Sequence, residues 1–435
     1  MSHKSELISS DINAYLEAQQ HKSLLRFITC GSVDDGKSSL IGRLLYESKM
    51  IFEDQLAALE ADSKKVGTRG GELDFALLVD GLAAEREQGI TIDVAYRFFS
   101  TEKRKFIVAD TPGHEQYTRN MVTGASTADL AVILIDARKG VLAQTRRHSY
   151  IAHLVGIPHL VVAVNKMDLV GYSREVFDQI CKDYLEFAAG LGIRDVRFMP
   201  LSALNGDMVV ERGEKLAWYN GPTLMELLEA APAAHSEARE NFRFPVQYVC
   251  RPRTAEHHDF RGYMGRVESG EIAVGDEVQV LPSGRTTRVK EIRLLDQSLP
   301  QAASERSVTL LLEDEVDISR GDMIVSPAST PTVTKQVEAM VCWLAETPLE
   351  AGRKLLLRHT TRETKALVAA IEYRQDINEL KRISGGRLAM NDIGSITFKL
   401  AQPLFVDRYR ENRSTGAFIL IDEATNNTVG AGMIA

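Results

Sequence analysis

The sequence predicts an α/β domain with a doubly wound, mostly parallel sheet, followed by two β-barrel domains. Short apolar runs alternate with helical periodicity from residue 24 to about residue 230. After a polar, charged connector around residues 234–241, the apolar period changes to two, which is typical of antiparallel strands. We therefore expect the 435 residues to divide into an N-terminal extension at 1–23, an α/β domain at 24–233, and β-barrel domains at 240–330 and 333–435.

Four runs of the first domain predict buried parallel strands, because each is continuously apolar and ends in a loop with Gly, Asp or Asn. They are LLRFITCG, KFIVADTPG, LAVILIDA and LVVAVNKMD. Two segments with helical periodicity lie between them, SSLIGRLLYES and REVFDQICKDYLEFAAGLG. Pro222 and Thr223 open a last predicted helix, and Pro232 follows it.

Alternating segments with regularly spaced turn glycines predict the two barrels. The first barrel contains RGYMGRVESGEIAVGDEVQVLPSG and RTTRVKEIRLL and is expected to end near GDMIVSP. The second contains TKQVEAMVCWL, KLLLRHTTRETKALVAAIEY, GSITFKLAQPLFV and GAFILIDEATNNTVGAGMI.

Composition narrows the class of protein. The formal net charge of −8 argues against broad electrostatic binding to nucleic acid. The four cysteines lie far apart and form no CxxC pair, which argues against a disulfide framework or a zinc site and favours a reducing cytoplasm. The polar N-terminus has no apolar core of a signal peptide, and the apolar stretches are too short for a membrane span.

A phosphate-binding loop is predicted between the first strand and the first helix, where the sequence matches G-x-x-x-x-G-K-[ST]. The glycines let backbone N–H groups point inward, Lys37 can reach the β- and γ-phosphates, and the Ser38 hydroxyl can ligate Mg²⁺. The alternative is a chance glycine turn before a helix. The predicted phosphate-binding residues are Gly31, Ser32, Val33, Asp34, Asp35, Gly36, Lys37, Ser38 and Ser39.

The segment ADTPGHE follows a predicted strand and suits a γ-phosphate site. Asp110 at the strand end can hold Mg²⁺ through water, and the Gly113 N–H can bond the γ-phosphate at close approach. His114 can position the attacking water. Taken singly, D-x-x-G also occurs in ordinary loops, and His114 also fits a surface histidine.

The segment NKMD ends another predicted strand and suits a guanine base. The Asp168 carboxylate can accept two N–H bonds from guanine N1 and its exocyclic amine, which adenine lacks in that arrangement. The Lys166 stem can lie along the purine ring, and Asn165 can tie this loop to the phosphate loop. A later segment, Ser202, Ala203 and Leu204, offers backbone N–H groups that can reach guanine O6. By itself, this short sequence is a weak signal for a guanine site.

Thr91 in REQGITID suits the remaining Mg²⁺ position, in a segment held only while the γ-phosphate is present. Alternatively, Thr91 is a threonine at the edge of the alternating strand ITIDVAYRFF. The motifs taken together decide between these interpretations. The phosphate loop, Thr91, the D-x-x-G segment, NKMD and the segment Ser202–Leu204 follow one another along the chain, and most of them come directly after a predicted strand. The sequence therefore predicts a P-loop GTPase domain that binds GTP or GDP with Mg²⁺, with Lys37, Thr91 and His114 as catalytic candidates.

With these motifs the chain resembles the translation-factor class of GTPases over nearly its full length. The resemblance implies that His114 orders the attacking water and that Val33 and Ile90 form an apolar gate beside it. Elongation factors usually show His-Val-Asp-His where this chain has SVDD. The stretches ITCGSVDDGKSSLIGRLLYES and DTPGHEQYTRNMVTGAS closely resemble the large GTP-binding subunit (subunit 1) of bacterial sulfate adenylyltransferase, or ATP sulfurylase.

This resemblance implies a partner. In the family, a small catalytic subunit makes adenosine 5′-phosphosulfate and pyrophosphate from ATP and sulfate for sulfate assimilation and cysteine biosynthesis. GTP hydrolysis on the large subunit drives accumulation of the unfavourable product, in a heterodimer or higher assembly. Some members carry a fused kinase domain, which needs a phosphate loop of its own, and no second such pattern follows residue 240.

Two other functions remain as alternatives: an elongation-factor-like GTPase that binds aminoacyl-tRNA, and a GTP-binding scaffold without turnover, against which Thr91 and His114 argue. The long segment from Glu47 to Gln88 is either a solvated insertion or a docking element for the small subunit that includes Lys64 to Gly71. Histidine spacing does not favour a metal site, since His148 and His153 are five residues apart, not one helical turn.

Overall fold

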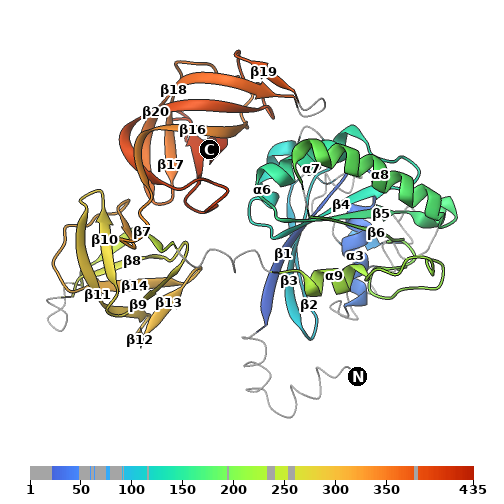
Figure 1. Cartoon of the computed structure of the whole chain (residues 1–435), viewed down its shortest axis with the longest axis horizontal. Coiled ribbons are helices and arrows are strands. Elements are labelled where there is room, and N and C mark those ends of the chain that lie inside the picture. The colour runs from blue at the N-terminus through green and yellow to red at the C-terminus, as the bar shows by residue number, and fades with distance from the viewer. Residues whose placement is uncertain are drawn as a thin grey trace, which may run out of the picture. The chain divides into compact units, whose positions relative to one another are not determined.

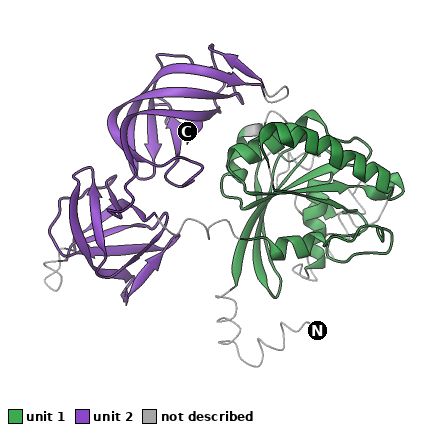
Figure 2. Ribbon diagram, viewed as in Figure 1, with its two compact units in different colours: residues 1–234 green, residues 235–435 purple. Residues whose placement is uncertain are grey.

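The computed structural model describes residues 22–48, 59, 63, 75–78, 91, 93–114, 117–193, 195–232, 241–252, 260–376 and 381–435. The chain forms two compact units, residues 1–234 and residues 235–435 (Figure 2). Among the described helices, none combines the length and the hydrophobicity that crossing a membrane requires.

The first unit contains a six-stranded sheet in the order β2-β3-β1-β4-β5-β6 (Figure 1). Only β2 runs antiparallel to its neighbour, and all other neighbours are parallel. The doubly wound, mostly parallel sheet predicted from the sequence is therefore confirmed. Its strands are β1 (Ser23–Cys30), β2 (Ala95–Ser100), β3 (Arg104–Asp110), β4 (Leu130–Asp136), β5 (His159–Asn165) and β6 (Val196–Pro200).

Helices cover both faces of this sheet. Figure 1 shows α6, α7 and α8 along one face and α3 and α9 along the other. The bounds are α3 (Lys37–Glu47), α6 (Thr118–Ala125), α7 (Ala143–Leu154), α8 (Arg174–Leu191) and α9 (Leu224–Ala230), with short 3-10 helices η1 (Phe75–Leu78) and η3 (Met167–Val170).

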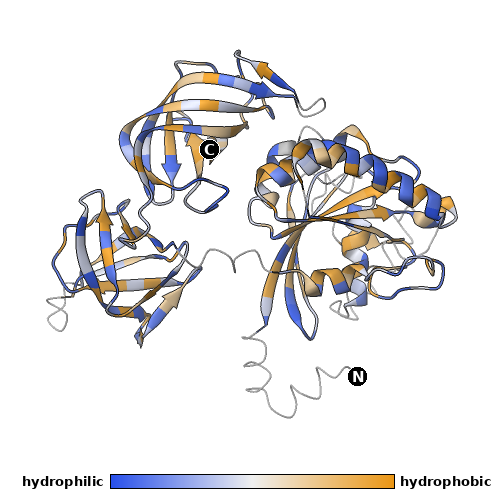
Figure 3. Cartoon of the chain, in the orientation of Figure 1, coloured by the Kyte–Doolittle hydropathy of each residue, from blue (hydrophilic) through white to orange (hydrophobic). Residues whose placement is uncertain are grey.

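Burial explains why the strands form where the apolar runs lie. All seven residues of β4 are buried, as expected for a central parallel strand covered on both faces. Figure 3 shows the central strands mainly in hydrophobic colours, whereas α7 and α8 carry both kinds. The last helix begins with a capping box, in which the Thr223 hydroxyl accepts a hydrogen bond from the Glu226 N–H and the Glu226 carboxylate accepts one from the Thr223 N–H.

The second unit contains two closed antiparallel barrels, as the sequence predicted. Pairing of β10 with β11 closes the first barrel, and pairing of β17 with β18 closes the second. The first sheet has β7 (Arg243–Cys250), β8 (Gly262–Arg266), β10 (Glu277–Leu281), β11 (Arg285–Leu294), β12 (Gln297–Leu299), β14 (Ser307–Leu312) and β15 (Met323–Val325), with a separate pair β9 (Glu271–Ala273) and β13 (Gln301–Ala303). The second has β16 (Thr332–Trp343), β17 (Lys354–His359), β18 (Arg362–Gln375), β19 (Arg382–Ser384), β20 (Ile393–Val406), β21 (Ala417–Ile421) and β22 (Thr428–Ile434).

The two barrels have the same order of strands around the ring, but the chain begins each ring at a different strand. Around the first barrel the order is β10-β15-β7-β8-β14-β11, and around the second it is β17-β21-β22-β16-β20-β18. The rings coincide when β8 is matched with β16 and the later strands follow in chain order. The first strand of one barrel, β7, then takes the place of the last strand of the other, β22. The second barrel therefore has the strand order of a circularly permuted first barrel.

A polar and apolar seam joins the barrels within this unit. Leu281, Met323 and Val325 from the first barrel form a buried cluster with Phe405 from the second. Arg243 of the first barrel is buried and makes two hydrogen bonds of 2.9 Å with the Asp407 carboxylate.

Candidate functional site

The loop between β1 and α3 has the backbone that the G-x-x-x-x-G-K-[ST] pattern predicts. Gly31, Asp34 and Gly36 all have positive φ angles, of 149°, 68° and 92°. A Cβ atom on Gly36 would lie 2.5 Å from Asn165 Nδ2, so both the φ angle and the close contact favour glycine there. The loop therefore wraps tightly before α3 begins at Lys37.

Lys37 is buried within this loop. Its Nζ donates hydrogen bonds to the Gly31 carbonyl at 3.2 Å and to the Ser32 carbonyl at 2.8 Å. Burial lowers the pKa of Lys37, and the nearby Asp110 and Asp35 carboxylates oppose that shift. The ammonium group thus has only neutral hydrogen-bond partners among the described residues, which leaves its charge available to an anion.

Two side chains hold the first amides of the loop. The Gly31 N–H donates to His148 Nδ1 at 3.1 Å, and the Ser32 N–H donates to Asp35 Oδ2 at 2.6 Å. Burial, with the positive charges of Lys37 and Arg147, lowers the pKa of His148 to about 3, so its imidazole is neutral and can accept this bond. Burial raises the pKa of Asp35, and Lys37 opposes the shift.

The hydroxyl and carboxylate predicted to ligate Mg²⁺ lie together. Ser38 Oγ donates to Asp110 Oδ2 at 2.9 Å, and Thr29 Oγ1 donates to Asp110 Oδ1 at 3.2 Å. Two oxygen groups thus meet beside the buried Lys37, which fits the oxygen ligands that Mg²⁺ prefers. Ser39 lies in the first turn of the same helix and is partly exposed.

Gly113 lies against the phosphate loop. A Cβ atom there would sit 2.7 Å from Lys37 Nζ and 2.9 Å from the Val33 nitrogen, so only glycine allows this approach. His114, the next residue, is exposed, and its ring lies 6.2 Å from the Tyr117 ring. The structure therefore brings the Gly113 backbone to the loop and presents His114 toward solvent.

Thr91 is described by the structure but makes no contact with this cluster that the structure records. Thr91 precedes β2, which begins at Ala95, so Thr91 is not a residue of that strand. Its proximity to Mg²⁺ stays a prediction. Ile90 and the segment from Lys64 to Gly71 lie outside the described residues.

The Asn165 side chain connects the NKMD segment to two other loops. Its Nδ2 donates to the Asp35 carbonyl at 2.8 Å, which ties the NKMD segment to the phosphate loop. Its Oδ1 accepts from the Ala203 N–H at 3.0 Å, which brings in the third loop. Asp168 Oδ1 accepts from the Ser202 hydroxyl at 2.7 Å, so the predicted guanine carboxylate is held in place, while Leu204 is partly exposed beside it.

Lys166 is held by a residue that sequence reasoning missed. Its Nζ lies 3.1 Å from Asp136 and also donates to the Asp34 carbonyl. Burial of Asp136 opposes ionisation, but hydrogen bonds from Arg138 and Lys166 outweigh it and hold the pKa below its usual value. The ammonium is fixed at one end, so the Lys166 stem is available to lie along a ring.

His148, Asp136 and Arg43 are the residues that the motifs did not single out. Arg43 on α3 donates to the Ala203 carbonyl at 3.1 Å and to the Leu204 carbonyl. No spacing in the sequence signals these contacts, since each joins segments far apart in the chain. The described residues contain no group of three or more His, Cys, Asp or Glu arranged for a metal ion.

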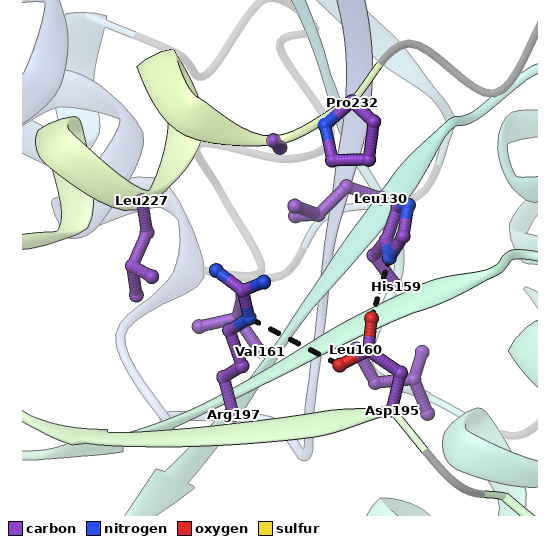
Figure 4. A pocket seen from close by; sticks show the side chains of 9 residues that line it. Leu130, His159, Leu160, Val161, Asp195, Arg197, Leu227 and Pro232 are labelled. Atoms are coloured by element: carbon purple, nitrogen blue, oxygen red, sulfur yellow. Dashed lines mark hydrogen bonds and ion pairs between the residues drawn. The ribbon is translucent and has the colours of Figure 1, made fainter. Parts of the chain in front are cut away.

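A small cavity lies at the amino ends of the parallel strands, opposite to the ends that carry the phosphate and base loops (Figure 4). Its lining includes Leu130 and His159, which begin β4 and β5, whereas the loops described above follow the carboxyl ends of the strands. His159 Nδ1 lies 2.6 Å from Asp195 Oδ2, and Arg197 lies 4.0 Å from the other Asp195 oxygen. The cavity is therefore separate from the phosphate and base loops.

Comparison with known proteins agrees with this geometry. Residues 22–234 match the elongation factor Tu GTP binding domain family, and residues 336–435 match the GTP-eEF1A C-terminal domain-like family. Among solved structures, the match to Sup35 complexed with GDP covers 95% of this chain and 94% of that chain, with 22% identity and a TM-score of 0.43.

Curated relatives match along the whole chain. "Sulfate adenylyltransferase subunit 1" of Cellvibrio japonicus is 58% identical over 434 residues, covering 100% of this chain and 91% of that protein. The protein of the same name from Saccharophagus degradans is 56% identical over the same shares. The chain therefore belongs to the sulfate adenylyltransferase subunit 1 family, within the translation-factor class of GTPases.

Proposed function

We propose that this chain hydrolyses GTP at the carboxyl edge of its parallel sheet to drive adenosine 5′-phosphosulfate synthesis on a separate, small catalytic subunit. The observation that carries the nucleotide assignment is the convergence of the phosphate loop, Asp110, Gly113, Asn165 and Ala203 at one sheet edge. The names of the relatives support the sulfate reaction and the existence of a second subunit.

Lys37 and the loop amides bind the phosphates, and the Gly113 N–H meets the γ-phosphate. Ser38, Thr91 and, through water, Asp110 would hold Mg²⁺, which would neutralise charge on the phosphate oxygens. The contact of Ser38 with Asp110 supports this, because it brings two oxygen donors together beside Lys37. Because the loop is already folded around Lys37, binding requires little ordering of the backbone.

The base lies between the loops that Asn165 joins. Asp168 accepts the two N–H bonds of guanine, the Lys166 stem covers the ring, and the backbone from Ser202 to Leu204 faces guanine O6. His114 orders the attacking water, with Val33 and Ile90 as the apolar gate. The exposed position of His114 supports this role, because its side chain is accessible to water.

The product is a sulfate–phosphate anhydride, which is very unfavourable to form, so the two reactions must be coupled through contact between two chains. We propose a heterodimer or higher assembly in the cytoplasm that serves sulfate assimilation and cysteine biosynthesis. Adenylyl transfer occurs on the partner, and this chain supplies the energy of GTP hydrolysis.

Reconstitution tests the proposal. The purified chain is mixed with a small catalytic subunit, ATP and sulfate, and phosphosulfate formation is followed with GTP, with a non-hydrolysable GTP analogue, or with no guanine nucleotide. We expect GTP to raise phosphosulfate yield while the analogue does not. Equal yields in all three mixtures would sink the coupling, and GTP-dependent retention of charged tRNA would favour an elongation-factor-like role instead.

Asp168→Asn tests the base assignment. The substitution replaces an acceptor by a donor, so base preference is expected to shift from guanine toward xanthine, whose ring presents an acceptor at the corresponding position. Competition between GTP and XTP for the purified variant measures the shift. Unchanged preference for GTP would contradict the placement of guanine on Asp168.

A further inference from the structure

Helix α3 connects the phosphate loop to two further segments. The helix begins at Lys37, and its second half contacts the loop from Ala203 to Gly206 and the short helix η1 (Phe75–Leu78). Arg43 is the residue that touches both. One side chain therefore links η1 to the loop expected at the base end of the site.

On the base side, the Arg43 guanidinium holds backbone carbonyls of the predicted guanine loop. Nε donates to the Ala203 carbonyl at 3.1 Å, and a terminal nitrogen donates to the Leu204 carbonyl. The N–H of the same Ala203 is bonded to Asn165 Oδ1 at 3.0 Å. Because a guanidinium is a rigid planar fork, two successive carbonyls held by it have little freedom to rotate.

On the other side, the same guanidinium stacks on an aromatic ring. The Arg43 guanidinium carbon lies 4.3 Å from the centroid of the Phe75 ring, which fits a cation–π contact. The Tyr46 ring lies 5.0 Å from that ring, and Phe75 is 5% exposed. Phe75 is therefore packed onto α3 through two side chains of that helix.

Glycine at position 42 makes this packing possible. A Cβ atom there would sit 2.0 Å from the Phe75 carbonyl oxygen and 2.7 Å from its carbonyl carbon, so any other residue would push η1 off the helix. The backbone of η1 thus rests directly on α3. In the chain, η1 lies between α3 and Thr91, within the segment that precedes the predicted switch threonine.

We propose that Arg43 is a positioning residue for the guanine loop and that the Phe75 ring is its latch, so that withdrawal of η1 from α3 accelerates nucleotide release. The proposal rests on the nucleotide site proposed above and adds a control over its off-rate. Neither side chain touches the nucleotide in this scheme. Phe75 acts on Arg43, Arg43 acts on the Ala203 and Leu204 carbonyls, and the loop acts on the base.

The proposal also predicts which step of the GTPase cycle changes when the contact between Phe75 and Arg43 is lost. The guanine loop contributes equally to binding of GTP and GDP and takes no part in cleavage of the γ-phosphate bond. Loss of the latch therefore weakens affinity for both nucleotides through faster dissociation, while hydrolysis of bound GTP keeps its rate. A general disruption of the domain would instead alter both steps and lower the unfolding temperature.

The test measures release of fluorescent GDP from the full chain by stopped flow, after thermal unfolding confirms that each variant is folded. Arg43→Met keeps the apolar stem but removes both carbonyl contacts and the 3.6 Å ion pair with Glu47, and we expect release to accelerate on the order of 10- to 100-fold. Phe75→Leu keeps an apolar side chain but removes the ring, and we expect acceleration of about 2- to 5-fold. Arg43→Lys, which keeps the charge without the fork, should fall between wild type and Arg43→Met.

The double variant Arg43→Met with Phe75→Leu is decisive. If the ring acts through Arg43, Phe75→Leu adds no further acceleration in the Arg43→Met background, and single-turnover hydrolysis at saturating GTP stays at the wild-type rate in all variants. The matched control is Arg146→Met, which removes another guanidinium stacked on a ring of this unit, that of Phe187 at 5.7 Å. The control should release GDP at the wild-type rate.

Distinct outcomes overturn distinct claims. Wild-type release rates in Arg43→Met or in Phe75→Leu would overturn the latch, as would multiplicative effects in the double variant. Failure of the wild-type chain to bind GDP would instead overturn the proposed nucleotide site, and the latch with it. Equal acceleration in Arg146→Met would show a nonspecific response of the domain and would also reject the proposal.

Discussion

Lys37 in the first unit and Arg243 in the second are both buried cations, but their hydrogen-bond partners differ in charge. Lys37 is 7% exposed and donates only to the Gly31 and Ser32 carbonyls. Arg243 is 2% exposed and faces the Asp407 carboxylate with two hydrogen bonds of 2.9 Å. One cation lacks a bonded counter-ion among the described residues, whereas the other has a bidentate one.

The difference separates a binding site from a structural contact. Burying a charge is costly unless an opposite charge and hydrogen bonds compensate it. At the barrel seam Asp407 provides that compensation, and the Phe242 and Ser329 carbonyls accept further bonds from Arg243. In the phosphate loop the compensation is incomplete, which is the expected condition of a group that awaits an anionic ligand.

Among the substitutions that test this contrast, Arg243→Ala is expected to have the largest effect. It leaves the Asp407 carboxylate buried without its partner, so we expect the free energy of unfolding of the barrel unit to fall by about 3–5 kcal/mol. Denaturant unfolding followed by Trp343 fluorescence reports on this unit, with Trp218→Phe in the background to remove the other tryptophan. GTP affinity should remain unchanged.

The pair of substitutions Arg243→Met and Asp407→Leu provides the control. Removing both charges should recover much of the lost stability, because neither is then buried alone. A single Arg243→Ala variant as stable as the wild type would mean that the seam does not depend on this ion pair.

Lys37→Met is expected to do the opposite. The ammonium is not hydrogen-bonded to a carboxylate, although Asp35 and Asp110 lie nearby, so we expect the stability of the nucleotide-free chain to change less than in Arg243→Ala. GTP affinity should fall on the order of 10²-fold, because hydrogen bonds between a charged group and phosphate are lost. Calorimetric titration measures the affinity. A large loss of stability with intact GTP binding would reverse the contrast.

His114→Ala sharpens the contrast within the nucleotide site itself. His114 is exposed, whereas Lys37 is buried, and we expect the first to serve chemistry and the second to serve binding. GTP hydrolysis should slow on the order of 10²-fold or more while GTP affinity is retained. Single-turnover assays with a parallel binding titration separate the two effects, and a variant that hydrolyses GTP normally would remove His114 from the mechanism.

His148→Gln tests the contact between His148 and the Gly31 N–H through the pH dependence of stability, and its expected effect is the smallest of these. The pKa of His148 in the folded chain is about 3, below its ordinary value of 6.5, so the unfolded chain binds this proton first as pH falls. The wild type therefore loses stability as pH falls below 6.5, by ~1 kcal/mol between pH 6.5 and 5.5 from this group. Because glutamine does not titrate, its variant should show a shallower loss in denaturant unfolding. Equal slopes would show that His148 does not titrate as its burial implies.

Much of the fold was predictable because its signals are local. The continuous apolar run of β4 and the alternation of β11 reflect which faces are buried, and burial follows from the residues themselves. The motif residues were predictable for a related reason. Gly36 and Gly113 stand where the backbone needs a positive φ angle or a close approach, and few other residues meet such a requirement.

Strand order in the barrels was not predictable in the same way. Both barrels show alternating strands with turn glycines, and nothing in that pattern distinguishes β7 as a first strand from β22 in the equivalent last place. Register and closure depend on pairing between strands distant in sequence, which local periodicity does not encode.

The sequence alone predicted the class of chemistry at this site, since the order and spacing of its motifs indicate phosphate, guanine and a γ-phosphate contact. Tertiary structure alone decided which other side chains hold those motifs in place. His148 reaches Gly31, Asp136 reaches Lys166, and Arg43 reaches Ala203. The physical reason is distance along the chain: a motif describes groups that meet a ligand through local backbone shape, whereas their supports come from other elements that only folding brings near.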